Sequence, residues 1–214
     1  MCIRDSIDPA DFAEKMCGLQ FTFADISEAH DAIGLTATSG VIITIPQRDG
    51  TRLDYELDGK TAFIDQSLVA ENQIGRLNFT MMHEAAHQLF WMLYPEEYEV
   101  QTPRCVFRMA DEHTQYPVLN WEEWQTNVLT SYLLLPKELV YRHMADVGLK
   151  DGVSVLNRIY ARKDYERFSE AAKRLGVSKT ALTIRLSQLG LVGRNDLYDP
   201  YALVDIFPEK NEIA

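Results

Sequence analysis

The chain has 214 residues, of which 46% are hydrophobic and 25% charged, and its formal net charge is −11. These values are ordinary for a globular protein with a proper core, and they exclude a disordered or fibrous chain. The acidic balance argues against nucleic acid as the main partner, and no apolar run is long enough to cross a bilayer. Because the three cysteines form no Cys-x-x-Cys pair and no signal peptide is visible, we expect a cytoplasmic protein without a disulfide framework.

The first third of the chain is predicted to supply a small sheet. Residues 11–18 are typical of a short helix that ends at a glycine. A β-branched run over residues 41–45, stopped by a proline, predicts a strand. Residues 53–57 alternate apolar and polar side chains, and residues 61–64 follow an Asp-Gly step, so we expect these two segments to form a tight hairpin. The sheet is therefore predicted to be largely antiparallel.

Two strong helices are predicted in the middle of the chain. Apolar residues recur at spacings of three and four from Phe79 to Leu93, which predicts an amphipathic helix with one buried stripe. Asn78 or Thr80 could cap its start, and Pro95 would end it. A second helix is predicted from about residue 121 to residue 135, where a proline follows.

The C-terminal part differs from the rest in charge. Residues 158–194 contain nine basic and three acidic side chains, a local charge of +6 that leaves −17 for the remainder. This shift predicts a separate basic unit over residues 151–214, after a first domain over residues 7–150. We expect the tail over residues 153–191 to be helical.

Within that tail, residues 168–189 have the spacing of a helix-turn-helix. Lys179 and Arg185 are candidates for phosphate contacts. The shape is common and the charge is modest, however, so we favour a helical unit that packs on the rest of the protein over one that binds DNA.

Two histidines and a glutamate form the motif His83-Glu84-Ala85-Ala86-His87 inside the first strong helix. At 3.6 residues per turn, both imidazoles project from one face and can meet one tetrahedral zinc ion at about 2.0–2.1 Å each. Glu84 is close to that face without being a natural third ligand, so it can act as the general base toward a water molecule that zinc activates. Because the chain has only five histidines, this order rarely arises by chance. The motif predicts one catalytic zinc ion per chain, with Glu84 as the catalytic residue.

A catalytic zinc ion needs a third protein ligand and one open position. The candidates that follow the motif are Asp111, Glu112, His113, Glu122 and Glu123. We favour Glu123, because Asn127 lies one turn later on the same helix face and can accept the spare ring N–H of a ligating histidine. Glu122 is the alternative, with Thr126 one turn later as a poorer partner. The predicted metal ligands are therefore His83, His87 and Glu123, supported by Asn127.

Two stretches carry a resemblance to a known family. The first is residues 75–90, in which a Phe-Thr step precedes the two histidines, and the second is residues 121–127, continuing through residues 133–136. In both, the chain resembles the ImmA/IrrE metallopeptidases, a branch of the thermolysin-like zincins. In that family, a Glu-x-x-x-Asn/Asp helix that ends in a Leu-rich run and a proline brings the third ligand. The resemblance extends over about residues 55–190, and it implies the same ligands, His83, His87 and Glu123.

This chain departs from the family pattern at two small residues. Ala86 stands where the family often has glycine, and Thr126 stands where it often has alanine. The resemblance implies an α+β fold, with a minimal zincin-like domain whose small mixed or antiparallel sheet packs on the two-histidine helix. It also implies a C-terminal unit resembling a helix-turn-helix. The implied activity is that of a cytoplasmic bacterial or phage endopeptidase with Glu84 as its base, and the implied partner is a protein substrate such as a transcriptional repressor.

Three functions are compatible with these residues. The first is a zinc endopeptidase that cleaves a regulatory protein, with His113 or Tyr132 as candidates for stabilising the oxyanion. The second is a non-catalytic regulator on a zincin fold that binds a repressor or DNA. The third is a structural zinc site, which would need four protein ligands. No membrane partner is expected.

Overall fold

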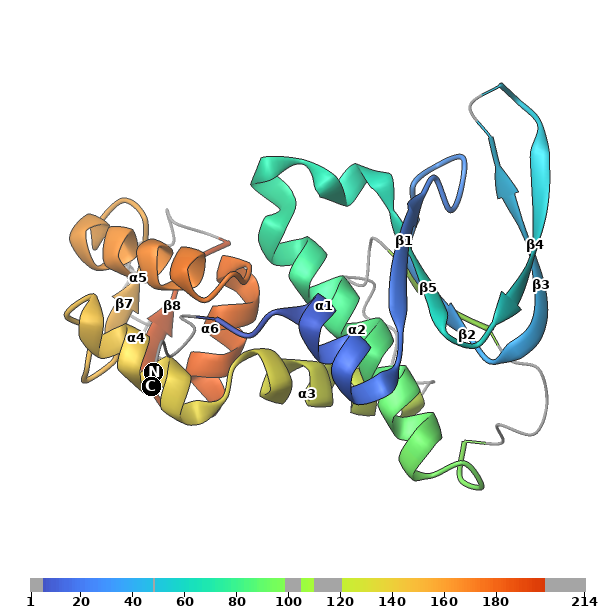
Figure 1. The fold of residues 1–214 in the computed structure, drawn as a ribbon. Helices are drawn as coiled ribbons and strands as arrows, with labels where there is room; N and C mark the ends of the chain where they lie inside the picture. Colours follow the sequence, from blue (N-terminus) through green and yellow to red (C-terminus); the bar gives the residue numbers. More distant parts are fainter. Residues whose placement is uncertain (1–5, 48, 99–104, 110–120, 199–214) are drawn as a thin grey trace, which may run out of the picture.

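The computed structural model describes residues 6–47, 49–98, 105–109 and 121–198. It shows a mixed α+β fold in which a sheet and a two-stranded ribbon occupy one end of the molecule and a group of helices occupies the other (Figure 1). In chain order the elements are α1 (Pro9–Phe12), η1 (Ala13–Cys17), β1 (Gln20–Ala24), β2 (Ala32–Ala37), β3 (Ser39–Pro46), β4 (Arg52–Asp58), β5 (Thr61–Asp65), η2 (Gln66–Val69), η3 (Glu71–Gln73), α2 (Ile74–Leu93), β6 (Cys105–Met109), α3 (Trp121–Leu134), α4 (Lys137–Asp146), β7 (Val153–Leu156), α5 (Arg162–Arg174), α6 (Lys179–Gln188) and β8 (Val192–Asn195). Within these ranges, no helix combines the length and apolar character needed to cross a bilayer.

The main sheet is mixed and has the strand order β1-β5-β2-β6. β1 runs parallel to β5, whereas β2 is antiparallel to both β5 and β6. Leu35 on β2 pairs with Phe63 on β5, and both side chains pack in one apolar cluster with Ile43 and Leu57 of the β3–β4 ribbon. The ribbon therefore covers one face of the sheet, which leaves the other face for α2.

The predicted hairpin between residues 53–57 and 61–64 is wrong. Both strands form, but β4 pairs with β3, and β5 pairs with β1 and β2 in the main sheet. The turn between them contains Gly59 at φ 73°, a left-handed conformation that glycine adopts without strain. This turn carries the chain from the ribbon into the sheet, so it joins two consecutive strands that do not pair with each other.

Helix α2 differs from the predicted amphipathic helix. It begins at Ile74, before either predicted cap, directly after the short 3-10 turn η3. Every residue from Thr80 to Gln88 is buried, whereas Leu93, which was placed in the buried stripe, is 60% exposed. The helix is enclosed because the sheet packs on one side and the C-terminal helices on another, as Figure 1 shows. The predicted end before Pro95 is confirmed.

The C-terminal part contributes the largest core cluster. Side chains of α4, α5 and α6 pack together there with Met82 of α2, around the fully buried Phe168. The predicted turn between two helices is present, because α5 ends at Arg174 and Ser178 caps the start of α6. Helix α4, which lies before residue 150, shares this core with α5 and α6. The domain boundary at residue 150 stays a prediction.

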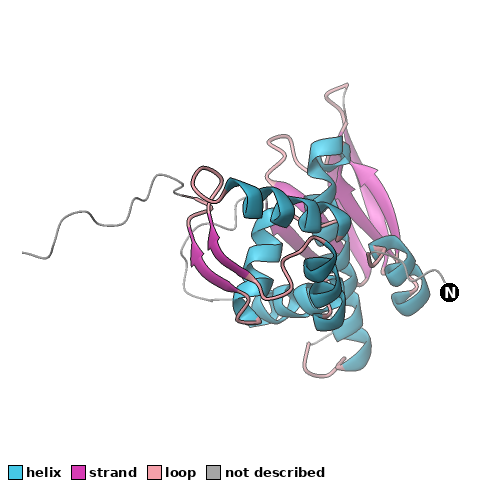
Figure 2. Ribbon diagram, turned by 90° about the vertical axis from the view of Figure 1, so that its left-hand side faces the viewer, coloured by secondary structure: helices cyan, strands magenta, loops and turns pink. Residues whose placement is uncertain are grey.

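The expectation that the tail over residues 153–191 is helical is wrong at its start. Residues Val153–Leu156 form β7, which pairs in parallel with β8, and Figure 2 shows this pair at the edge of the helical part. Arg185, proposed as a phosphate contact, is buried. Its Nε donates to the Leu135 carbonyl at 3.0 Å, and its guanidinium lies 4.1 Å from the centre of the Tyr132 ring. Arg185 therefore ties α6 to the end of α3 and does not face solvent.

Helix α2 contacts the C-terminal part through its first two turns. Asn78 lies in the second turn of α2, and its side-chain amide donates to the Gly176 carbonyl at 2.8 Å. At Gly75, an added Cβ would lie 2.5 Å from the backbone of Val177 and Ser178. Since real Cβ atoms do not approach backbone so closely, the contact requires glycine, and it fixes the start of α2 against the turn before α6.

Candidate metal centre

His83 and His87 lie one turn apart on α2, and both side chains are fully buried. Their Nε2 atoms are 3.1 Å apart and the ring planes are inclined at 81°. Two ring nitrogens this close cannot both direct free lone pairs at each other without repulsion, so the pair requires a proton or a cation between them. The spacing of four residues produces this arrangement because it returns the helix to the same face.

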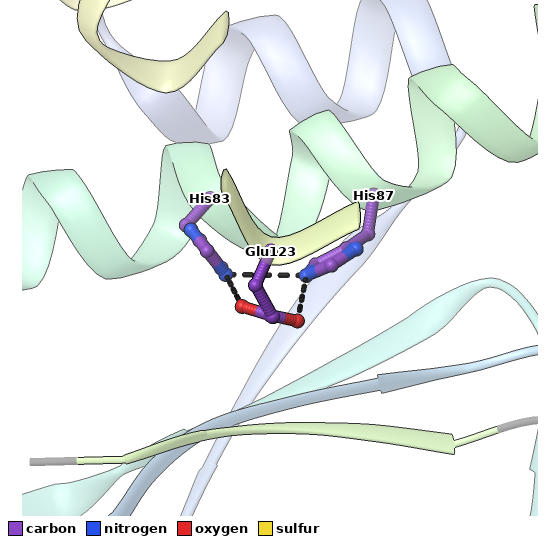
Figure 3. A group of neighbouring side chains, drawn as sticks. All are labelled: His83, His87 and Glu123. Atoms are coloured by element: carbon purple, nitrogen blue, oxygen red, sulfur yellow. Dashed lines mark hydrogen bonds and ion pairs between the residues drawn. The ribbon is translucent and has the colours of Figure 1, made fainter. Parts of the chain in front are cut away.

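Glu123, in the first turn of α3, completes the group (Figure 3). Its Oε2 lies 3.2 Å from His83 Nε2, and its Oε1 lies 3.1 Å from His87 Nε2. Ligand atoms around a tetrahedral zinc ion with bonds of about 2.0–2.1 Å are about 3.3 Å apart, so the spacing fits an ion of that size. The His83, His87 and Glu123 group could therefore hold a metal ion, and it unites the three predicted ligands.

The charges around this group favour a cation. Burial lowers the pKa of the His87 imidazole, but the neighbouring Glu122 and Glu123 carboxylates outweigh burial and raise that pKa to about 9. Burial raises the pKa of the Glu123 carboxyl, yet His83 and His87 outweigh it and hold this pKa well below its usual range. A metal ion would take the place of the proton between imidazole and carboxylate, so its binding would release that proton.

Glu84 follows the first histidine and is fully buried between α2 and β2. On β2 it faces Gly34, where an added Cβ would overlap Glu84 Oε1 and lie 2.7 Å from the Thr80 methyl group. Gly34 thus provides the space that the carboxylate occupies. Sequence reasoning missed this residue, because a glycine within an apolar strand does not reveal which side chain it faces across the sheet.

The alternative third ligand, Glu122, has a different place. Its Oε1 accepts a hydrogen bond from Trp91 Nε1 at 3.0 Å and lies 3.6 Å from Nδ1 of His87, on the side of the ring away from Glu123. Glu122 is therefore a neighbour of the ligand group and not a member of it. Asn127 is half-buried on α3, and its predicted bond to a ligating histidine stays a prediction.

Other predicted residues fall outside the site or outside the described structure. The ring of Tyr132, a candidate for the oxyanion, lies against Arg185. The candidates Asp111, Glu112 and His113 lie outside the described residues.

Asp25, His30 and Asp65 form a second group of possible ligands within the described ranges. Asp65 is fully buried at the end of β5, and its carboxylate accepts from the backbone N–H groups of Ile26 and Ser67. His30, at φ 52°, adds its Nδ1 at 3.0 Å. The Asp65 carboxylate is thus already bonded within the protein, which explains its burial without any ion.

Comparison with known proteins adds no assignment: no family model matches the chain, and no curated protein matches it significantly. Two imidazoles and one carboxylate are a donor set of catalytic zinc sites, which keep a fourth position open. A buried carboxylate, Glu84, lies next to this set on the same helix.

Proposed function

We propose that this chain is a zinc-dependent endopeptidase of the ImmA/IrrE type, acting in the cytoplasm on a regulatory protein. The observation that carries the proposal is the convergence of His83, His87 and Glu123 within 3.2 Å of one another, with Glu84 beside them. The two sequence stretches that resemble the family contain these four residues and support the same reading.

In this proposal His83, His87 and Glu123 hold the ion. Zinc, when bound, supplies Lewis acidity toward a scissile carbonyl and lowers the pKa of a coordinated water molecule to about 7. Glu84 accepts the proton of the attacking water and then donates it to the leaving amine. Gly34 leaves room for that carboxylate, and burial of the two imidazoles excludes bulk water from their side of the site.

The proposed substrate class is a protein, with a helix-turn-helix repressor as the first candidate. This choice rests on the family resemblance alone. The alternative is a non-catalytic regulator on the same scaffold that binds a repressor or DNA. The burial of Arg185 removes one of the two proposed phosphate contacts, and the other, Lys179, donates to the Tyr165 hydroxyl at 2.9 Å.

The test is replacement of Glu84 by Gln, with Glu71→Gln on the exposed turn before α2 as the matched control. Zinc-loaded proteins are incubated with a peptide library made from bacterial proteins, and new termini are identified by mass spectrometry. Glu84→Gln should retain zinc and lose cleavage by about 10²–10⁴-fold, the usual contribution of a general base. The control should cleave like the unmodified protein.

Two outcomes would overturn the proposal. Undiminished cleavage by Glu84→Gln would remove Glu84 from the mechanism. A zinc-loaded wild-type protein that cleaves neither the library nor candidate repressors would favour the non-catalytic regulator.

A further inference from the structure

The side of His87 that faces away from Glu123 is enclosed by three polar side chains. Nδ1 of His87 lies 3.4 Å from the Thr126 hydroxyl oxygen and 3.6 Å from Oε1 of Glu122. Glu122 in turn accepts from Trp91 Nε1, and the Trp91 ring lies 5.9 Å from the His87 ring, centre to centre. All four residues are buried, so their hydrogen-bonding groups depend on one another and not on solvent.

The Thr126 hydroxyl has one proton, and its shorter contact defines where that proton goes. Oγ1 donates to the Glu122 backbone carbonyl at 2.8 Å, one turn earlier on α3. Toward His87 the hydroxyl then presents only lone pairs, so it can accept a hydrogen bond there but cannot donate one. The matching tautomer of His87 carries its proton on Nδ1 and leaves Nε2 free for a metal ion.

The Glu122 carboxylate supports the same tautomer by its charge. At 3.6 Å from Nδ1 it is too distant for a good hydrogen bond, but in a buried environment its negative charge still favours a proton on that nitrogen. Trp91, four residues after His87 on α2, holds Oε1 in place through the indole N–H. One helix thus supplies both the ligand and the donor that orients the carboxylate behind it.

We propose that Thr126, Glu122 and Trp91 are positioning residues that fix His87 as the Nδ1–H tautomer and aim its Nε2 at the metal. The inference rests on the metal site of the proposed function, but it does not require peptidase activity. It assigns a purpose to Thr126, a position at which this chain departs from the ImmA/IrrE pattern. It also assigns one to Glu122, which the ligand group itself leaves out.

The first test measures zinc affinity by competition with a chromophoric chelator. Thr126→Val keeps the shape of the side chain but removes the acceptor, and Glu122→Gln removes the charge while keeping an oxygen for Trp91. Each should weaken zinc binding by about 10–100-fold, the usual effect of losing a partner behind a metal-bound histidine. Thr126→Ser restores the hydroxyl and should return the affinity to within a few-fold of wild type, as about one hydrogen bond is regained. Trp91→Phe removes the indole donor and should weaken binding in the same direction.

A second measurement reports the tautomer directly. In zinc-loaded protein labelled with ¹⁵N at histidine, His87 should give an Nδ1–H proton signal that exchanges slowly with water. In Thr126→Val that signal should shift or broaden, whereas Thr126→Ser should retain it. Circular dichroism of each variant shows whether it is folded, so a change in affinity is not mistaken for unfolding.

The outcomes separate this inference from the proposed function. Wild-type protein that binds no zinc would overturn the metal site and with it the peptidase proposal. Wild-type protein that binds zinc, with equal affinity in Thr126→Val, Thr126→Ser and Glu122→Gln, would overturn the positioning role alone. A ¹⁵N spectrum that places the His87 proton on Nε2 would do the same.

Discussion

The described part of the molecule has two places where histidine and carboxylate side chains gather within 4.8 Å, and they differ in how their lone pairs are used. At the end of β5, the Asp65 carboxylate is occupied by backbone N–H groups and by His30. Between α2 and α3, two Nε2 atoms and the Glu123 oxygens converge on one another. The comparison teaches that ligand-type residues in proximity do not define a metal site. What makes the α2–α3 group a candidate is that donor atoms from two helices converge on one point.

The largest expected effect is on metal content. His87→Ala and Glu123→Ala should each reduce bound zinc from about one per chain to none, because three protein donors are the minimum for a catalytic site. His30→Ala is the matched control in the second group, and it should leave the zinc content unchanged. Elemental analysis of the purified proteins measures this. Zinc that is lost in His30→Ala but kept in His87→Ala would mean that the group around Asp65 holds the ion.

The same two groups should rank in the opposite order when the free energy of unfolding is measured instead of the zinc content. Asp65→Ala leaves the buried Ile26 N–H and the partly buried Ser67 N–H without their charged acceptor, so it should lower the free energy of unfolding by about 2–3 kcal/mol. Glu123→Ala, compared in the presence of a chelator, should lower the free energy of unfolding by less, because the Glu123 side chain is 25% exposed whereas that of Asp65 is fully buried. Urea unfolding of the two variants tests this ranking. A greater loss in Glu123→Ala would show that the Glu123 carboxylate is structural.

The close approach of sheet and helix gives a third test, specific to the α2 site. Gly34→Ala should destabilise the protein by about 1–3 kcal/mol, because the new methyl group overlaps Glu84 and crowds Thr80. Placed in a Glu84→Ala background, the same change should cost less, since one of the two clashes is gone. Thermal unfolding of the four proteins completes the cycle. If the losses of stability caused by Gly34→Ala and Glu84→Ala simply add, the backbone shifts to make room for the methyl group.

The smallest expected effect is the pH dependence of the second group. The hydrogen bond and charge of Asp65 raise the pKa of His30 above its ordinary value near 6.5. Burial raises the pKa of Asp65, but hydrogen bonds from Ser67, His30 and Ile26 outweigh it and lower that pKa below 3.8. The charged His30 side chain therefore stabilises the folded state fully below pH 6.5, and this stabilisation is lost as the pH rises through the raised pKa. Asp65 contributes fully above pH 3.8, and its contribution is lost as the pH falls through the lowered pKa.

Both contributions to stability are present between about pH 4 and 6.5. In this range the free energy of unfolding of wild type should exceed that of His30→Ala by less than about 1 kcal/mol, because His30 is half exposed. Unfolding curves for both proteins at pH 5.5 and pH 9 measure the difference, which should narrow at the higher pH. A gap that widens toward pH 9 would show that His30 stabilises the loop in its neutral form.

Local patterns in the sequence predicted the residues whose relative positions follow from helical periodicity. The His83 and His87 pair and the Glu123 helix follow from spacing, and the structure brings them together. The structure also shows contacts that spacing does not contain. Trp91 meets Glu122 across two helices, and Gly34 meets Glu84 across the sheet. Such contacts depend on tertiary packing, which no periodicity of a single segment encodes.

The wrong predictions have the same origin. The segment Val153–Leu156 is too short for its period to distinguish strand from helix, and its partner β8 lies beyond α5 and α6 in the sequence. Arg185 was a candidate phosphate contact because it is charged, whereas it donates to the Leu135 carbonyl in the interior. The continuous burial of α2 could not be predicted either, because its second covering layer comes from residues about a hundred positions later.

Exposure differs among the three residues of the α2–α3 site. Both imidazoles have 0% of their side-chain area exposed, whereas Glu123 has 25%. Of these three side chains Glu123 is the one that reaches solvent, so we expect it to be the ligand that yields first when an ion is exchanged. A protein of this design would load and release its metal at a rate governed by rotation of a single carboxylate. Slow exchange would then protect the ion from competing chelators even where the equilibrium favoured them.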